Sequence, residues 1–393
     1  MTISQGSNTF NGLKLSRMTQ DRIRSANYYL TDFLTEALGS HRDFELTLRV
    51  SKKNLDSIRT NEAAYRDLMG TPFLVVTPTL TEVNDWKSLT DHTTSTLAID
   101  KLRKDTPRLN GQDQIRLFYN NRQYLWMLVE LLHTSVLAAP LLGISQELAD
   151  YLRKVPQHVL DLGIAQVEFP IFRWRISSKL FWTEYQSDRI SPEALAHYFL
   201  ASTPIRADRL EHKHSWSNLR LHRYQSKVYS EMLIRQHCRA STVGSLLAIS
   251  LTTSRRLYMD IHGVSSPSGK VPSSLNWYFE APTYRQQATM MVSLYRMALA
   301  TGSNVPAAFI AAFDIMQSLF GSDLKLTADR ACHICRAMAS SAEVELAPCR
   351  ICSTPYLIAN TGPRIELSHN FACPSCSASL SHQTVAKRKR RDK

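Results

Sequence analysis

Glycine and proline are scarce in this sequence, and no catalytic motif is present. The 393 residues include only 13 Gly and 16 Pro, which excludes fibrous and low-complexity proteins. The hydrophobic fraction is 44% and the charged fraction is 21%, so the chain is too apolar to remain disordered. It has no glycine-rich phosphate loop, no distinctive pair of carboxylates and no Ser-His or Cys-His grouping of recognisable spacing. We therefore expect a globular protein of about two to three domains that is not an enzyme.

Export signals and long uninterrupted apolar runs are also missing. The N-terminus has neither the basic stretch nor the apolar stretch of a signal peptide. The most apolar segment, residues 124–142, contains Glu130, His133 and Pro140, which favours an amphipathic helix over a membrane span. We therefore expect a cytoplasmic protein with no membrane partner. In that reducing compartment, paired cysteines bind metal rather than form disulfides.

Acidic residues are outnumbered, and the excess positive charge is concentrated in two zones. Lys and Arg number 47 against 34 Asp and Glu, a formal net charge of +13. Residues 206–239 carry eight basic and three acidic residues, residues 384–393 carry six and one, and each zone therefore has a net charge of +5. Such zones favour a polyanionic partner, because each phosphate contact releases condensed counterions. For the tail alone, a solubilising role is the alternative.

Apolar residues recur at helical spacing through the N-terminal half. The pattern predicts helices over 19–38, 48–68 and 115–138, shorter helices near 145–154 and 156–163, and short strands at 73–76 and 167–172. A polar segment, residues 80–112, is predicted to be a linker. Six residues of the second helix recur 94 positions later, at Leu142, Ser145, Asp150, Arg153, Asp161 and Leu162. They indicate a degenerate internal repeat, with coincidence as the alternative.

The region 224–338 is predicted to be helical and has the outline of a helix-turn-helix. A short apolar helix at 245–249 leads into a turn at 250–252 and a second helix at 253–263, with Thr252 or Thr253 as its N-cap. Ordinary packing of two helices is the alternative interpretation.

Basic side chains follow this turn and recur at the end of the chain. Arg255 and Arg256 lie in the first turns of the second predicted helix, and Lys270 lies in the loop 264–274. Arginine near a helix N-terminus reaches base edges or phosphates. We therefore predict DNA contacts from these three residues and from five in the tail: Lys387, Arg388, Lys389, Arg390 and Arg391.

Four of the seven cysteines have the spacing of a zinc site. Cys349 and Cys352 form one Cys-x2-Cys pair, and Cys373 and Cys376 form another 20 residues further on. Two residues between thiolates let both sulfurs reach one ion, so the pairs predict one structural Zn²⁺ per chain. Four thiolates leave no coordination position open for substrate, which excludes a catalytic role for the metal.

A third pair, Cys332 and Cys335, competes for the same ion. It lies in a predicted helix, residues 326–338, where two buried thiols on one face are the favoured interpretation. Metal ligation by these cysteines together with His333 is the alternative. Cys238 is expected to be a lone thiol in the core.

In their order, these motifs resemble the FlhD/FlhC family of bacterial flagellar master regulators. The resemblance to FlhC covers about residues 224–393 and depends on the cysteine pairs, the basic tail and Ser250, Leu257, Tyr258, Asp260, Gly263, Pro267, Gly269, Pro272 and Trp277. The segment 124–174 resembles FlhD at Leu142-Gly143-Ile144, Leu152, Pro156-Gln157 and Phe172-Arg173-Trp174.

The resemblance implies a sequence-specific transcription activator that binds double-stranded promoter DNA and acts with RNA polymerase. The family assembles four FlhD and two FlhC subunits, and the zinc role carries over to the two pairs at 349–352 and 373–376. This chain differs, because it is one polypeptide with about 110 extra residues in front. If those residues form a second FlhD-like unit, a homodimer would rebuild the whole complex. A zinc-containing RNA-binding or structural assembly protein is the alternative.

The expected fold is mainly α, with short strands in helical FlhD-like units. The predicted order is a disordered N-terminus (1–17), a degenerate FlhD-like unit with linker (18–110), an FlhD-like unit (111–203), a basic His-rich connector (204–223), a helical FlhC-like DNA-binding domain (224–346), a zinc-ribbon-like subdomain (347–380) and a basic tail (381–393). We expect the protein to be associated with the nucleoid.

Overall fold

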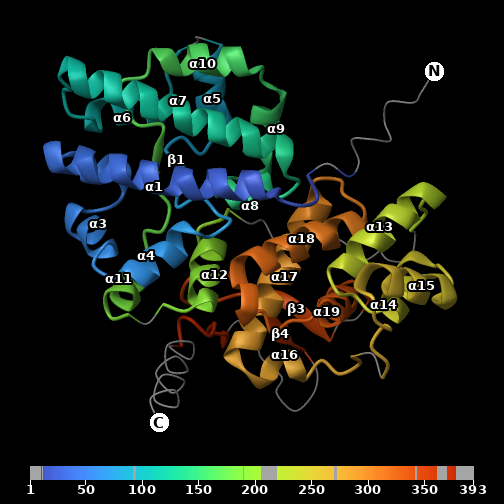
Figure 1. The fold of residues 1–393 in the computed structure, drawn as a ribbon. Coiled ribbons are helices and arrows are strands. Elements are labelled where there is room, and N and C mark those ends of the chain that lie inside the picture. Colours follow the sequence, from blue (N-terminus) through green and yellow to red (C-terminus); the bar gives the residue numbers. More distant parts are fainter. Residues whose placement is uncertain are drawn as a thin grey trace, which may run out of the picture. The chain divides into compact units, whose positions relative to one another are not determined.

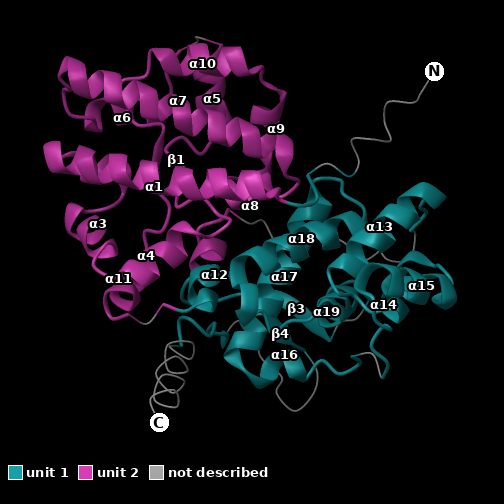
Figure 2. Cartoon of the chain, viewed as in Figure 1, with its two compact units in different colours: residues 1–14, 191–197, 206–393 teal, residues 15–190, 198–205 magenta. Residues whose placement is uncertain are grey.

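The computed structural model of the chain is mainly helical (Figure 1). It describes residue 10 and residues 12–91, 94–188, 190–204, 219–269, 272–340, 343–360 and 370–377. The chain divides into unit 1, residues 1–14, 191–197 and 206–393, and unit 2, residues 15–190 and 198–205 (Figure 2). Most of the predicted connector and all of the predicted basic tail lie outside the described residues.

Unit 2 is built from two successive copies of one arrangement. The first copy comprises α1 (Arg17–Ser40), α2 (Phe44–Leu48), α3 (Lys52–Ile58), α4 (Glu62–Met69), β1 (Val76–Pro78), α5 (Val83–Thr90) and α6 (Leu97–Asp105). The second comprises α7 (Gly111–Thr134), α8 (Ala138–Leu142), α9 (Gln146–Lys154), α10 (Gln157–Ala165), β2 (Phe172–Trp174), α11 (Lys179–Gln186) and α12 (Pro192–Ala201). Each element begins 94 to 96 residues after its counterpart, which makes the internal repeat a structural fact. The start of α12, through His197, belongs to unit 1.

In each copy, a buried asparagine on the long first helix forms hydrogen bonds with the backbone just before the strand. The Asn27 side chain of α1 donates to the Phe73 carbonyl at 3.0 Å and accepts from the Val75 N–H at 3.0 Å. Its counterpart in α7, Asn121, donates to the Phe169 carbonyl and accepts from the Ile171 N–H, both at 3.0 Å. In both copies an amide side chain therefore satisfies the backbone just before the strand, where no neighbouring strand is available.

One strand from each copy forms the only sheet described in unit 2. β1 and β2 pair antiparallel, with Val76 opposite Trp174 and Thr77 opposite Arg173. Figure 1 shows α1 and α7 side by side next to β1. The helix that follows each strand packs on the opposite copy. α5 packs on α9 and α10 of the second copy, and α11 packs on α3 of the first. The copies are thus related by an approximate two-fold axis through the sheet, as in a dimer joined into one chain.

Three predictions from the sequence are wrong here. The predicted helix over 48–68 is not one helix, because α2 ends at Leu48 and the rest of the stretch forms α3 and α4. Residues 80–112 are not a linker, because they contain α5 and α6, and Trp86 of α5 is 1% exposed with its indole N–H donating to the Leu80 carbonyl. The stretch 12–17 is not disordered, because Leu13 and Leu15 are buried and the Ser16 side chain caps α1 by accepting from the Thr19 N–H.

The main part of unit 1 is described from residue 219, and its first helix begins at Arg223. Its elements are α13 (Arg223–Arg235), α14 (Ala240–Leu247), α15 (Leu251–His262), α16 (Trp277–Glu280), α17 (Pro282–Ala300), α18 (Val305–Phe320), η2 (Gly321–Asp323), α19 (Ala328–Ser340), β3 (Val344–Pro348) and β4 (Pro355–Ala359). α17 and α18 pack together as its core. The segment Val305–Asp323 has the length and composition of a membrane span, but 67% of its apolar window is buried inside the protein. α18 is therefore accounted for as a core helix.

Replacing the buried asparagine tests the repeat. Asn121→Ala would leave the Phe169 carbonyl and the Ile171 N–H unpaired, and each unpaired buried group costs about 1–3 kcal/mol, so we expect the free energy of unfolding to fall by about 2–6 kcal/mol. Urea unfolding followed by circular dichroism measures this change. Gln123→Ala, an exposed position on the same helix, is the control and should shift the free energy by less than about 0.5 kcal/mol. Equal effects in the two variants would contradict the role of Asn121.

Candidate metal centre and the paired helices α14 and α15

A hairpin and the segment after it bring the two cysteine pairs together. The turn between β3 and β4 carries Cys349 and Cys352, and the Cys349 N–H donates to the Thr354 carbonyl at 3.0 Å. The second pair, Cys373 and Cys376, lies next to the first because the Arg350 N–H donates to the Phe371 carbonyl at 2.9 Å. Two backbone hydrogen bonds therefore position both pairs.

The four sulfurs have the spacing of a tetrahedral metal site. All four Sγ atoms of Cys349, Cys352, Cys373 and Cys376 lie within 4.8 Å of one another. Sulfurs bound to one zinc ion at about 2.3 Å are about 3.8 Å apart. The Cys352 and Cys373 sulfurs are separated by 3.8 Å. The donor set and its spacing fit a metal ion.

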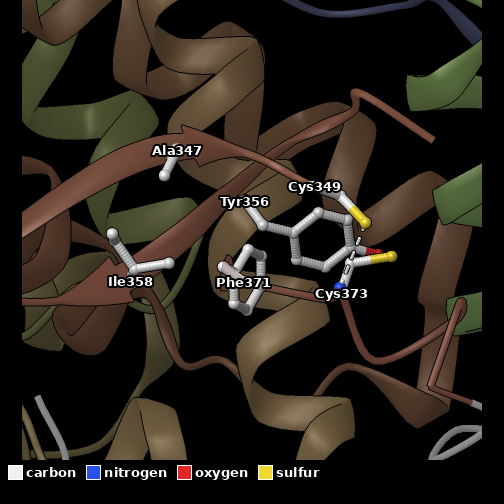
Figure 3. Packing of buried hydrophobic residues seen from close by; sticks show 6 residues of the cluster. All are labelled: Ala347, Cys349, Tyr356, Ile358, Phe371 and Cys373. Atoms are coloured by element: carbon white, nitrogen blue, oxygen red, sulfur yellow. Dashed lines mark hydrogen bonds between the residues drawn. The ribbon is translucent and has the colours of Figure 1, made fainter. Parts of the chain in front are cut away.

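Backbone N–H groups point at these sulfurs. Cys349 Sγ accepts from the N–H of Ile351 at 3.4 Å and from the N–H of Cys373 at 3.3 Å, and Cys373 Sγ accepts from the N–H of Cys376 at 3.4 Å. Figure 3 shows the Cys349 and Cys373 side chains with their sulfurs pointing in the same direction. Such hydrogen bonds stabilise thiolates, which are the form that binds metal.

Without a cation the sulfurs are too close to ionise together. A hydrogen bond with Cys352, together with burial, raises the pKa of Cys376 to about 12. Hydrogen bonds with Cys352 and Cys376 also raise the pKa of Cys373, whereas the same two neighbours lower the pKa of Cys352. Four crowded thiols of this kind are converted to thiolates by a metal ion, which displaces their protons.

The aromatic core beneath the cysteines reaches a histidine that the sequence did not reveal. Tyr356 and Phe371 are buried and form a small core with the cysteines (Figure 3). The Tyr356 hydroxyl hydrogen-bonds Nδ1 of buried His197 at 2.9 Å, and this imidazole also hydrogen-bonds the Cys352 side chain. His197 stands alone in an apolar stretch of α12, far from the cysteines in sequence. No sequence pattern identifies such a neighbour of the metal centre.

The third cysteine pair does not join the cluster. Cys332 and Cys335 are buried on α19, and burial raises the pKa of Cys332 to about 12 and that of Cys335 well above its ordinary value. His333 Nδ1 hydrogen-bonds the Tyr278 hydroxyl at 2.9 Å. In the described ranges, no second group of three or more Cys, His, Asp or Glu residues brings its ligand atoms together. Neutral buried thiols remain the favoured interpretation.

The predicted helix pair is present as α14 and α15, which pack against each other. The first helix is longer than expected, and the second is capped by Ser250, whose hydroxyl accepts from the Thr253 N–H at 3.2 Å. α15 ends at Gly263, whose φ of 70° suits glycine.

Two of the predicted DNA contacts can be placed on this pair. Arg255 and Arg256 lie on α15, and both are exposed. Lys270 and the five basic tail residues fall outside the described residues.

Comparisons with known proteins place this chain among transcriptional regulators. A family model described as "Flagellar transcriptional activator (FlhC)" matches residues 222–391, which include α15 and all four cysteines. The flagellar transcriptional regulator FlhC of Cupriavidus metallidurans is 30% identical over 151 residues, which cover 37% of this chain and 67% of that protein. The chain belongs to the FlhC family. The resemblance of unit 2 to FlhD stays a prediction.

Removing one ligand tests the metal centre. Cys373→Ser should lose the bound metal and unfold the segment around β3 and β4, because structural metal contributes on the order of 10 kcal/mol to such a small region. Atomic absorption of the purified protein measures the metal. Cys335→Ala, which changes a buried thiol on α19, is the matched control and should keep full metal content. Full occupancy in Cys373→Ser would contradict the assignment, and loss in Cys335→Ala would favour the third pair.

Proposed function

We propose that this protein is a transcription activator that binds promoter DNA through α14 and α15. The observation that carries the proposal is the surface of α15, on which only Ser254 and Tyr258 are buried. Arg255 and Arg256 project from this surface, and no carboxylate lies in the first turn of the helix. An exposed helix with arginines near its N-terminus suits the major groove of a duplex. Membership of the FlhC family supports RNA polymerase as a partner and the cytoplasm as the location.

We assign one structural zinc ion to the four cysteines. Four thiolates at tetrahedral spacing favour zinc over oxygen-preferring cations. When bound, the ion cross-links the β3–β4 turn to residues 373–376. Its role is to order this part of the FlhC-like region rather than to contact substrate.

RNA binding is the alternative, and the surface of α15 does not favour it. Single-stranded RNA is recognised largely by aromatic side chains that stack on unpaired bases. The exposed face of α15 instead presents Leu251, Met259 and two arginines. A duplex that contains two related half-sites should therefore bind more tightly than a single strand.

The repeat in unit 2 supports the predicted stoichiometry. We propose that each of its two copies corresponds to one FlhD subunit, so that one chain supplies two FlhD-like units and one FlhC-like unit. Two chains then form a complex of four FlhD-like units and two FlhC-like units. Covalent fusion favours this assembly, because it replaces bimolecular association with a high effective concentration.

Substituting both arginines of α15 tests DNA recognition. Each bidentate arginine–base pair contributes about 1–3 kcal/mol, so Arg255→Ala with Arg256→Ala should weaken specific duplex binding at least about ten-fold. The duplex is chosen by genome-wide occupancy mapping, and affinity is measured by fluorescence anisotropy. Arg235→Ala, an exposed arginine on α13, is the control for lost charge. Unchanged discrimination between specific and random duplexes in the double variant would contradict the proposal.

The basic tail should add affinity without adding sequence preference. Deleting residues 387–391 should weaken binding to all duplexes and flatten the dependence of log K on log salt by about 0.9 per lost phosphate contact. A titration series in sodium chloride measures the slope. A slope equal to that of the intact chain would show that the tail does not touch DNA.

Light scattering tests the assembly. The chain has a mass of 44.7 kDa, and we expect a particle of twice this mass. Dilution over a wide concentration range shows whether the dimer is stable. A stable tetramer, or a monomer at all concentrations, would overturn the proposed stoichiometry.

A further inference from the structure

We infer that unit 2 contains a binding pocket for a small molecule that carries a phosphate group. A cavity of about 260 Å³ lies where the two copies meet, and its lining includes Arg49 and Thr77 from the first copy and Arg173, Arg175, Ser177 and Ser178 from the second. Among the described residues, no Asp or Glu lines it. In this part of the chain, three guanidinium groups and several hydroxyls thus surround a space without a carboxylate. The inference goes beyond the proposed function and does not depend on it.

Two of the arginines have no partner in the part of the chain that the structure describes. The Arg49 and Arg173 side chains make no hydrogen bond or ion pair there, although Arg173 is half-buried. Burial, with repulsion from Arg49, lowers the pKa of Arg173 to about 10. Neighbouring like charges without a counterion oppose folding, and a bound anion would neutralise them. The planar guanidinium fork matches phosphate oxygens.

The third arginine adds a buried charge that no described carboxylate balances. Arg175 is 4% exposed and donates only to neutral acceptors, among them the Leu141 carbonyl at 3.0 Å, the Pro140 carbonyl at 2.9 Å and the Ser202 hydroxyl at 2.8 Å. A Cβ at Gly143 would come within 2.7 Å of its Nε, so a glycine leaves room for the guanidinium. These acceptors satisfy its hydrogen bonds but leave its positive charge, which favours an anion in the adjoining cavity.

A helix N-terminus faces the same cavity. Ser178, a lining residue, is the N-cap of α11, its side chain makes no capping hydrogen bond, and the first turn contains no acidic residue. The free N–H groups of a helix start bind anions. In the first copy, the equivalent helix α5 has Glu82 as its N-cap and Asp85 in its first turn. The second copy therefore lacks the carboxylates that occupy this end in the first.

The backbone at Arg49 supports a functional role for its side chain. Arg49 has a φ of 55°, in the left-handed region that favours glycine, and its counterpart in the second copy is Gly143, with a φ of 70°. An arginine held in this conformation is strained, and such residues cluster at ligand sites. Its position at the cavity rim accounts for an arginine at a site where glycine would adopt the backbone conformation with less strain.

Phosphate titration of the full chain tests the pocket. We expect inorganic phosphate, added at constant ionic strength against chloride, to bind saturably by calorimetry and to raise the melting temperature. Arg49→Gln and Arg173→Gln should each weaken this binding at least about ten-fold, because hydrogen bonds to charged groups are lost. Arg24→Gln, an exposed arginine on α1 outside the cavity lining, is the charge-matched control and should bind as the native chain does.

A second measurement separates ligand binding from a structural role. Without phosphate, Arg173→Gln should melt at or above the native temperature, because it removes a repulsive charge; a structural arginine would give a lower temperature. Absence of saturable phosphate binding in the native chain, or native affinity in both variants, would overturn the inference.

The phosphate in the pocket could belong to a small molecule or to the DNA backbone, and binding of a random DNA duplex distinguishes these two sources. We expect the double variant Arg49→Gln, Arg173→Gln to bind this duplex with native affinity while its phosphate binding is lost. If duplex affinity falls in parallel, the pocket holds a DNA phosphate, and the assignment to a small molecule is wrong. The outcome is independent of the metal content and of α15.

Discussion

The antiparallel pairing of β1 with β2 is the constraint on which unit 2 depends. Each strand has only three residues, and each copy has only one strand in its described residues, so neither copy completes a sheet alone. Pairing across the copies places Thr77 opposite Arg173 and requires α5 and α11 to pack on the opposite copy. The buried asparagines on α1 and α7 then satisfy the backbone that the short strands leave unpaired. The cavity with its arginines follows from this pairing, because its lining comes from both copies.

Unit 1 is held together partly by residues that lie outside the FlhC family match. Glu193, in the first turn of α12, accepts a hydrogen bond from Gln287 of α17 at 3.0 Å, and the same amide accepts from the N–H of Leu326. One turn later, His197 contacts Tyr356 and Cys352 at the metal centre. The family match begins at residue 222. The FlhC-like region of this chain is therefore completed by a helix from the N-terminal half, as fusion into one polypeptide permits.

Local sequence patterns were sufficient for the long helices and for the cysteine cluster. The helices at 19–38 and 115–138 were predictable because apolar residues line one face over many turns. The cysteine cluster was predictable because its ligands come in two closely spaced pairs. Segment 80–112 was misjudged as a linker, since α5 is short and polar and is stabilised by packing on α9 and α10 of the second copy. The strands lie two to five residues later than expected, because hydrophobicity marks burial rather than pairing.

By itself, the sequence determined what depends on neighbouring residues: the helical class, the end of α15 at Gly263, the grouping of the four cysteines and the two basic zones. Only the tertiary structure decided what depends on residues far apart in the chain. It revealed the exchange of helices between copies, the contact of His197 with the metal centre and the grouping of Arg49 with Arg173. The physical reason is that capping, periodicity and ligand spacing act over a few residues. Long-range contacts arise instead from burial and shape, which leave no local pattern in the sequence.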